Sequence, residues 1–199
     1  REDRMDLLNF LKDHAPCYIY DGKKVVDQCR KLKESLSGFE FLYSIKTNAF
    51  PPMIQEVSKE GFGADAASSE EVKLAAENGI RPEKIFYSSP GKTDRDMEEC
   101  YGKCTIIADS ISEIRRINQI AARRGDIAKI GVRVNPDFSM LSEKGCSSKF
   151  GIDAEQLLKA EQMLSECLSV QIIGIHIHIQ SQILDYRILG KYYQNCFAL

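Results

Sequence analysis

Short apolar runs alternate with amphipathic stretches along most of this 199-residue chain. The runs are rich in branched and aromatic residues and predict strands, at 39–46, 62–67, 84–88, 104–108, 128–134 and 170–179. The amphipathic stretches have the period of a helix, at 7–11, 25–36, 53–60, 68–78, 93–101, 110–125, 154–167 and from 186 onward. Two of these predicted helices begin with Ser-x-x-Glu capping boxes, at Ser68 and Ser110.

Strands and helices alternate with a period of roughly 20–25 residues, which is typical of βαβ units and predicts a parallel sheet. No Gly-x-Gly-x-x-Gly motif follows the first of these strands, so a (β/α)8 TIM-type barrel is favoured over a doubly wound sheet. We expect an α/β barrel that is truncated after its sixth strand and occupies residues 39–199. Residues 1–38 are predicted to be an N-terminal segment that contains a strand at 15–21.

The charges are nearly balanced, with 27 Lys and Arg against 29 Asp and Glu. They are spread along the chain rather than collected into a basic stripe, which argues against nucleic-acid binding. No apolar run approaches the roughly 20 residues of a membrane span, and no signal peptide is recognisable at the start. The seven cysteines are irregularly placed, which indicates free thiols in a reducing environment. A cytoplasmic protein without membrane or nucleic-acid partners is therefore expected.

Each predicted strand is apolar along its length and becomes polar where it ends. The exits are Lys46-Thr-Asn, Asp65, Ser88-Ser89, Asp109, Arg133-Val-Asn135 and His176 to Ser181. In a barrel the carboxyl ends of the strands meet at one mouth, where such proteins place their chemistry. Solvated strand ends would explain the serines and Asp109, but they explain poorly a lysine, an arginine and two histidines. This mouth therefore suits an anionic ligand that carries a carbonyl group.

Lys46 is the residue on which the functional interpretation depends. A lone lysine at a strand end usually extends its stem to reach water, but desolvation frees an amine to attack a carbonyl. Such an amine could hold pyridoxal 5′-phosphate, with a histidine against the cofactor ring and hydroxyl or backbone N–H groups at its phosphate. The alternative is a metal held by His176 and His178. It is disfavoured because the chain has three histidines and His14 precedes the barrel, so we predict no metal site.

Five motifs occur in order along the chain: Y-S-I-K-T-N (43–48), G-A-D-A-A-S-S-E-E (63–71), R-V-N-P (133–136), S-K-F-G-I (148–152) and G-I-H-I-H-I-Q-S-Q-I (174–183). Together they resemble the pyridoxal-phosphate-dependent decarboxylases of the alanine-racemase fold, the diaminopimelate/ornithine decarboxylase family. The resemblance is strongest to the diaminopimelate decarboxylase branch and covers nearly the whole chain. Five ordered motifs are far more specific than a single lysine.

The resemblance implies a role for several residues of this chain. Lys46 would be the Schiff-base lysine, His178 would stack on the cofactor ring, and Ser181 would contact its phosphate. Arg133 matches an arginine on the cofactor side of the fifth strand. Asp65 matches an acidic residue that lines the pocket near the cofactor lysine.

Three further positions leave alternatives open. Glu71 matches a second acidic pocket residue, but it is also the partner of Ser68 in a capping box. His176 is either a packed neighbour or a participant. Gln180 stands where the family usually has glycine, so either the turn before Ser181 is rebuilt or cofactor binding is weaker, because glycine alone adopts positive φ without strain.

By resemblance the expected reaction is the decarboxylation of an amino acid, most closely meso-diaminopimelate to lysine. The alternatives are an amino-acid racemase on the same fold and a non-catalytic homologue or fragment. The family also implies that residues 16–21 add a strand to a second, β-rich domain, and that the complete protein is a homodimer. The rest of that domain, a glycine-rich phosphate loop and a partner-subunit cysteine would lie beyond Leu199, so we expect the chain to be a fragment.

Overall fold

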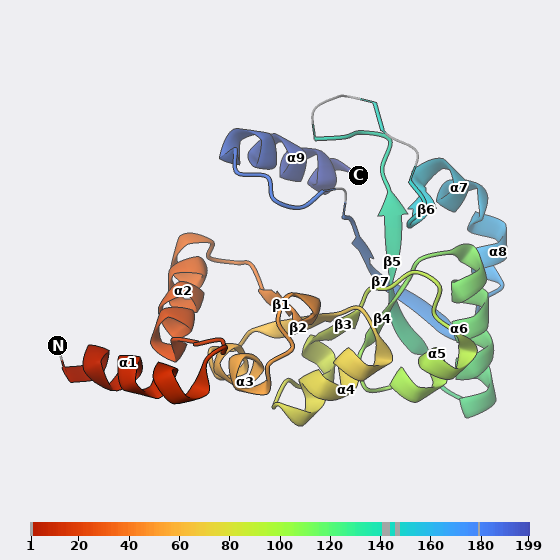
Figure 1. Cartoon of the computed structure of the whole chain (residues 1–199). Coiled ribbons are helices and arrows are strands. Elements are labelled where there is room, and N and C mark those ends of the chain that lie inside the picture. The colour runs from red at the N-terminus through yellow and green to blue at the C-terminus, as the bar shows by residue number, and fades with distance from the viewer. Residues whose placement is uncertain (1, 141–143, 146–147, 179) are drawn as a thin grey trace.

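A curved sheet of parallel strands forms the centre of the protein (Figure 1). The computed structural model describes residues 2–140, 144–145, 148–178 and 180–199. Neighbouring strands follow chain order: β1 (Leu42–Ser44), β2 (Gly63–Ala66), β3 (Ile85–Tyr87), β4 (Thr105–Ala108), β5 (Ala128–Asn135) and β7 (Val170–His176). The short β6 (Ile152–Asp153) pairs with the carboxyl end of β5. This order confirms the predicted partial barrel with six successive parallel strands.

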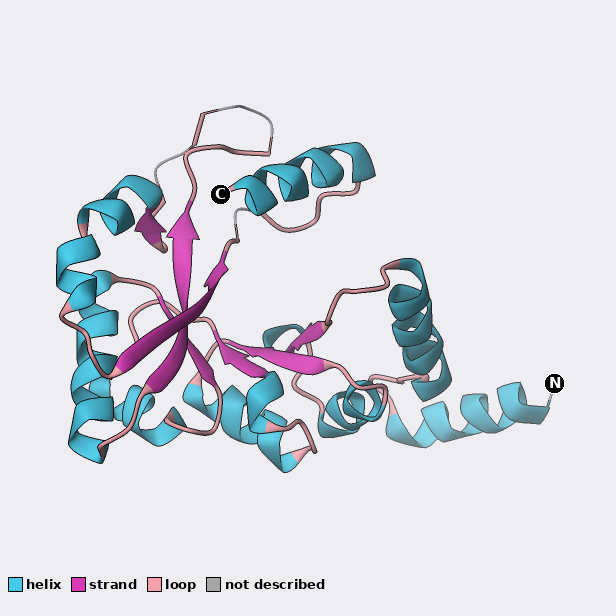
Figure 2. Ribbon diagram, turned by 180° about the vertical axis from the view of Figure 1, so that it is seen from behind, coloured by secondary structure: helices cyan, strands magenta, loops and turns pink. Residues whose placement is uncertain are grey.

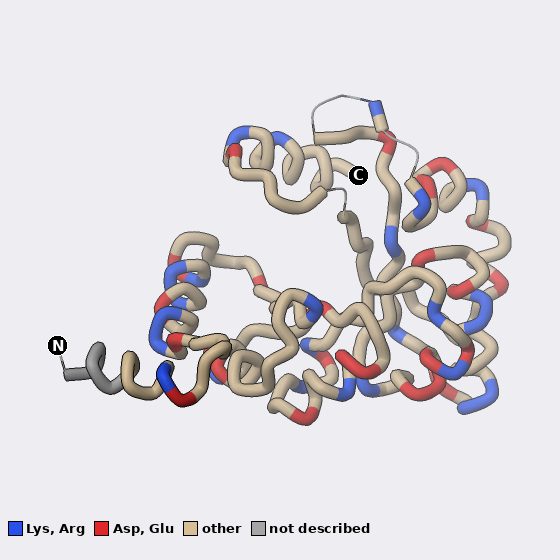
Figure 3. The backbone as a smooth tube through the Cα atoms, viewed as in Figure 1, with Lys and Arg blue, Asp and Glu red and all other residues tan. Residues whose placement is uncertain are grey.

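Most of the helices cover the outer face of the sheet, whereas the first two helices and the last one lie apart from that face; Figure 2 shows this arrangement from behind. The helices are α1 (Glu2–His14), α2 (Gly22–Ser35), α3 (Pro51–Lys59), α4 (Ser69–Glu77), α5 (Asp94–Cys100), α6 (Ile111–Arg124), α7 (Ala154–Lys159), α8 (Glu161–Ser165) and α9 (Tyr186–Ala198). Acidic and basic residues are intermixed along these helices (Figure 3), as the balanced composition predicts. No helix in the described part of the chain is long and apolar enough to cross a membrane.

Alternate residues of the strands pack against the helices and form the core. In β5 these are the even-numbered residues 128 to 134, which lie in one buried cluster with Ile114, Ile117 and Ile120 of α6. A second cluster joins β2 and β3 to α4 in the same way. Because side chains alternate between the two faces of a strand, the odd-numbered residues of β5, which include Arg133 and Asn135, face the concave side. The strand pattern therefore fixes which residues can reach the barrel mouth.

The predicted capping residues begin their helices. The hydroxyl oxygens of Ser68 and Ser110 accept hydrogen bonds from the N–H groups of Glu71, at 3.1 Å, and Glu113, at 3.2 Å. In a capping box the glutamate accepts from the N–H group of the capping serine, whereas here each glutamate accepts from the N–H group of the residue before that serine. Their carboxylates accept from the N–H groups of Ala67, at 2.7 Å, and Asp109, at 2.9 Å. Each cap therefore also fixes the end of the preceding strand.

Three predicted elements that precede β7 differ from the structure. Residues 15–21 form no strand in the described part of the chain, because a strand needs a hydrogen-bonded neighbour and none lies beside them. The strand predicted at 39–46 is limited to β1 and continues as a 3-10 turn, Ile45–Thr47. The helix predicted at 154–167 is interrupted at Ala160, where no glycine or proline marks the break.

A close backbone contact explains one glycine of the sheet. A Cβ atom at Gly63 in β2 would lie 2.3 Å from the carbonyl oxygen of Lys84 and 2.6 Å from Cδ2 of Leu42. The carbonyl belongs to the backbone just before β3 and cannot move without disturbing the ladder between β2 and β3. Only glycine fits this position.

Replacing Gly63 with alanine is therefore expected to destabilise the protein by about 1–3 kcal/mol, through overpacking against a rigid neighbour. Chemical unfolding of the protein expressed at its full length measures this change. Gly190→Ala is the matched control, because it adds the same methyl group to α9 where no atom lies within 4 Å. Equal stability of the two variants would contradict the steric explanation.

Candidate functional site

The polar strand exits converge on one cavity of about 710 Å³ at the carboxyl ends of the strands. Its walls come from the ends of β1, β2, β3, β5 and β7 and from the loop between β5 and β6. The residues that line it are Ser44, Lys46, Thr47, Asp65, Ala67, Ser88, Ser89, Pro90, Arg133, Asn135, Phe138, Ser139, Ser148, Phe150, His176, His178, Gln180 and Ser181. Every predicted exit except Asp109 contributes to this lining, so the hypothesis of a common mouth is confirmed.

Asp65 holds the first three strand exits together. Its carboxylate accepts a hydrogen bond from the Ser44 hydroxyl of β1, at 2.7 Å, and another from the Ser88 hydroxyl, which follows β3. The two serines satisfy both carboxylate oxygens and orient them at the cavity wall. A fixed acid at this wall can face a cationic or hydrogen-donating part of a ligand.

Arg133 is tied to the strands on both sides of β5. Its guanidinium lies 3.4 Å from an Asp109 carboxylate oxygen and 3.5 Å from the carbonyl oxygen of His178. The other Asp109 oxygen accepts from the N–H of Gly151, at 3.0 Å, and the Phe150 ring lies 5.0 Å from the guanidinium carbon. Asp109 therefore acts from behind the cavity, where it neutralises and orients the arginine.

Lys46 lines the cavity but is not buried in it. The 3-10 turn directs Ile45 into the core and leaves the Lys46 side chain exposed. The expectation of an amine enclosed among apolar side chains at a strand end is therefore wrong for this chain. Within the residues that the structure describes, the amine has no hydrogen-bond or ion-pair partner. It lies at the same mouth as both histidines of the β7 exit, where it can meet a ligand.

The two histidines sit in different surroundings. Burial, together with the Arg133 cation, lowers the pKa of His176 to about 4. Burial also lowers the pKa of His178, and Arg133 and Lys46 add to the shift. Both imidazoles are thus neutral at pH 7. The Nδ1 atom of His176 is buried, and no described residue supplies it with a hydrogen-bond partner, which leaves one polar atom at the cavity for a ligand.

The structure bears on two positions for which the sequence left alternatives, Glu71 and Gln180. Glu71 does not line the cavity, because its carboxylate is directed to the N–H of Ala67, so the structure gives it the capping role. Gln180 lines the cavity without positive φ, and the left-handed residue of the turn is Gln182, with φ of 61°. The positive φ of this turn therefore lies at Gln182, one residue after Ser181. The predicted strand 170–179 ends at His176, and Ile179 lies outside the described residues.

Sequence reasoning missed the aromatic part of the lining. Phe138 and Phe150 belong to the long loop after β5, which has no periodicity to predict its path. The S-K-F-G-I motif includes Phe150, but nothing in its spacing indicates that the ring would lie beside Arg133. Ser44 lies in a quoted motif, and only the tertiary structure brings it to Asp65.

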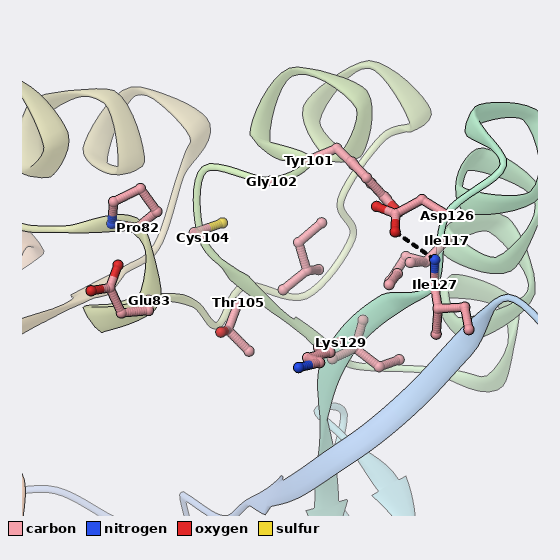
Figure 4. Close-up of a pocket in the computed structure, with 13 residues that line it drawn as sticks. Pro82, Glu83, Tyr101, Gly102, Cys104, Thr105, Ile117, Asp126, Ile127 and Lys129 are labelled. Carbon is pink, nitrogen blue, oxygen red and sulfur yellow. Dashed lines mark hydrogen bonds between the residues drawn. The ribbon is translucent and has the colours of Figure 1, made fainter.

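A second cavity, of about 330 Å³, lies at the opposite, amino ends of β4 and β5 (Figure 4). Its polar lining residues include Thr105 and Lys129. Tyr101 and Asp126 also line it, and the Tyr101 hydroxyl donates a hydrogen bond to the Asp126 carboxylate at 3.1 Å. None of the candidate site residues lies in it. In the described ranges, no group of three or more His, Cys, Asp or Glu side chains could hold a metal ion. Every cysteine in those ranges is a free thiol.

A parallel α/β barrel with an amine, a guanidinium and two neutral imidazoles at its mouth suits an anionic, carbonyl-bearing ligand. Residues 22–197 match the family model of the pyridoxal-dependent decarboxylases, specifically their pyridoxal-binding domain. The chain belongs to this family.

Individual relatives agree with the family. Diaminopimelate decarboxylases of Zymomonas mobilis and Aquifex aeolicus are 33% and 31% identical to this chain, each over 86% of it. These alignments cover 44% and 42% of the two relatives, so the chain spans about half the length of the curated relatives it matches. The crystal structure of Helicobacter pylori diaminopimelate decarboxylase, complexed with L-lysine, superposes with a TM-score of 0.83 at 25% identity. That superposition covers 96% of this chain and 51% of the other.

The neutral state of His176 predicts a pH dependence of stability. Its folded pKa of about 4 lies below the ordinary value of 6.5, so the unfolded chain binds the proton more readily and stability is lost as the pH falls from 6.5 towards 4. This histidine then contributes up to about 3 kcal/mol at pH 7 that is absent at pH 4.

Chemical unfolding of the cofactor-free protein at pH 7 and pH 4.5 measures the loss. His176→Gln should reduce the difference between the two pH values, whereas His14→Gln, on the exposed surface of α1, should leave it unchanged. Titrating carboxylates affect all three proteins alike and cancel in the comparison. An unchanged difference in His176→Gln would contradict the buried, neutral assignment.

Proposed function

We propose that the chain binds pyridoxal 5′-phosphate through Lys46 and forms part of an enzyme that decarboxylates a diamino acid, meso-diaminopimelate to lysine. The observation that carries this proposal is the position of the Lys46 amine in one cavity with Arg133, His176 and His178. The family match and the diaminopimelate decarboxylases among the relatives support the reaction class.

The residues present fit the cofactor. A primary amine is required to join its aldehyde, and the Lys46 amine has no competing partner in the described ranges. The cavity also offers a neutral imidazole for the ring, at His178, and hydroxyl groups for the phosphate, with Ser181 as the leading candidate. The buried, unpaired Nδ1 of His176 leaves a polar position for a bound group to satisfy.

When bound, the cofactor supplies an electron sink for the negative charge that remains on Cα after CO2 leaves. The chain supplies orientation and charge. Arg133, fixed by Asp109, favours anionic groups at the mouth, and Asp65, fixed by Ser44 and Ser88, favours a protonated or hydrogen-donating group. His178, a neutral imidazole at the cavity wall, would pack against the cofactor ring and help to orient it.

The proposed substrate is supported by the relatives rather than by this cavity, and the proposed assembly rests on the resemblance to the family. A complex with L-lysine is known for the Helicobacter pylori enzyme, which favours a substrate with a second amino group. We further propose a homodimer in the cytoplasm, with the residues that select the distal amino group outside this part of the protein. Ser181 lines the cavity between Gln180 and Gln182, which supports a phosphate contact from its hydroxyl.

Replacing Lys46 with alanine is expected to abolish the visible absorbance of the bound cofactor and to reduce turnover at least about 1,000-fold, because the covalent attachment is lost. Borohydride reduction followed by peptide mass spectrometry locates the attachment in the unmodified protein. Lys46→Arg is the matched control, since it keeps the positive charge but cannot form the bond. Attachment at another lysine would refute the assignment.

Release of labelled CO2 identifies the reaction. We expect release from meso-diaminopimelate and much less from ornithine or arginine. Exchange of the Cα proton without CO2 release would instead indicate a racemase, and the absence of any cofactor absorbance would indicate a non-catalytic homologue.

A further inference from the structure

An ion pair between Lys92 and Glu113 is buried behind the cavity and has no part in its lining. The two side chains are 0% and 2% exposed, and the ammonium nitrogen lies 3.0 Å from a carboxylate oxygen. Most other ion pairs in the described residues are much more exposed. Removing two charges from water is costly unless they are paired and hydrogen-bonded, so a pair in this position calls for a reason beyond net stability.

Every polar group of the pair is satisfied. The Lys92 ammonium also donates to the carbonyl oxygens of Ile107, at 2.6 Å, and Ser89. Glu113 accepts from the N–H groups of Lys92, at 3.2 Å, and Asp109, at 2.9 Å. At the edge of the pair, Arg116 donates to the carbonyl oxygen of Lys92 at 2.9 Å. The pair therefore fixes the backbone segments to which it is hydrogen-bonded, and neither charge lacks a partner.

These hydrogen bonds end at two strand exits that serve the cavity. Ser89 follows β3 and lines the cavity beside Ser88, whose hydroxyl binds Asp65. Asp109 follows β4, and its carboxylate binds Arg133 and the N–H of Gly151. One buried pair thus fixes the backbone next to both charged anchors of the cavity wall.

Helix capping alone does not require the lysine. At the start of α4, Ser68 and Glu71 form the same arrangement as Ser110 and Glu113 do in α6, with the glutamate bonded to the N–H group before the cap. Among the described residues Glu71 has no cationic partner. Lys92 is therefore an addition to a motif that forms without it, and its further bonds lead to the β3 exit.

We propose that Lys92 and Glu113 are positioning residues for the cofactor site, which hold the exits of β3 and β4 so that Asp65 and Arg133 keep their places at the cavity wall. This inference rests on the proposed function. It predicts that the pair determines cofactor affinity although neither residue touches the cofactor.

The double substitution Lys92→Met and Glu113→Gln tests the proposal, because it removes both charges and keeps similar side-chain volume. In the protein expressed at its full length, the dissociation constant for pyridoxal 5′-phosphate, measured by absorbance titration, should rise about 10- to 100-fold. Amide hydrogen exchange of the cofactor-free protein should accelerate at residues 88–92 and 109–110. Arg123→Met with Glu98→Gln is the matched control, since it removes an exposed pair between α5 and α6 and should change neither value.

The single substitution Glu113→Gln keeps the test decisive if the double variant does not fold, because glutamine retains one acceptor oxygen. Glu113→Gln should also weaken cofactor binding, by a smaller factor than the double substitution. Lys92→Arg should retain more of the cofactor affinity than Lys92→Met. Cofactor affinity and hydrogen exchange equal to those of the unmodified protein, in the double or the single variant, would overturn the positioning role alone. Failure of the unmodified protein to bind the cofactor would overturn the proposed function and this inference with it.

Discussion

The two-residue period of the parallel strands is the constraint on which the rest of the structure depends. Because one set of alternate side chains must be buried against the helices, the other set is free to face the barrel interior. In β5 the buried set is a continuous apolar row, and the interior set ends in Arg133 and Asn135. The same alternation of side chains brings Ser44, Asp65 and His176 to one mouth, although their strands are far apart in the sequence. A polar cavity wall thus arises from a packing rule, without any long-range sequence signal.

Charged groups at this mouth are held in place by hydrogen bonds to neighbouring side chains. Asp65 is fixed by two serines, and Arg133 is fixed by Asp109. Asp109 in turn is held through its N–H group by Glu113. Hydrogen-bonded charges at a partly dry surface stay oriented before a ligand arrives, which is the physical basis of electrostatic preorganisation. Lys46 differs from them, because its amine is exposed and has no hydrogen-bond or ion-pair partner among the described residues.

The family assignment and the geometry support each other from different directions. The ordered motifs indicate the family from local sequence, and the superposition with TM-score 0.83 reflects the course of the whole backbone. Neither depends on the side-chain network of the cavity. That network gives the assignment its chemical content, since it joins an amine, an anchored arginine and neutral imidazoles in about 710 Å³. The chain spans about half the length of its relatives, and the cavity walls named above all belong to this half.

The sequence by itself determined the alternation of strands and helices, the capping residues and the polar exits, because each depends on neighbours a few residues apart. It also indicated Lys46, Asp65, Arg133, His178 and Ser181 through local motifs. Only the tertiary structure decided that Lys46 follows the strand on an exposed turn, that Glu71 caps a helix instead of lining the pocket, and that Lys92 and Glu113 form a buried pair. These outcomes depend on contacts across more than 20 residues or on the exact end of a strand. Local pattern carries no information on either, since burial is a property of the assembled sheet and its helices.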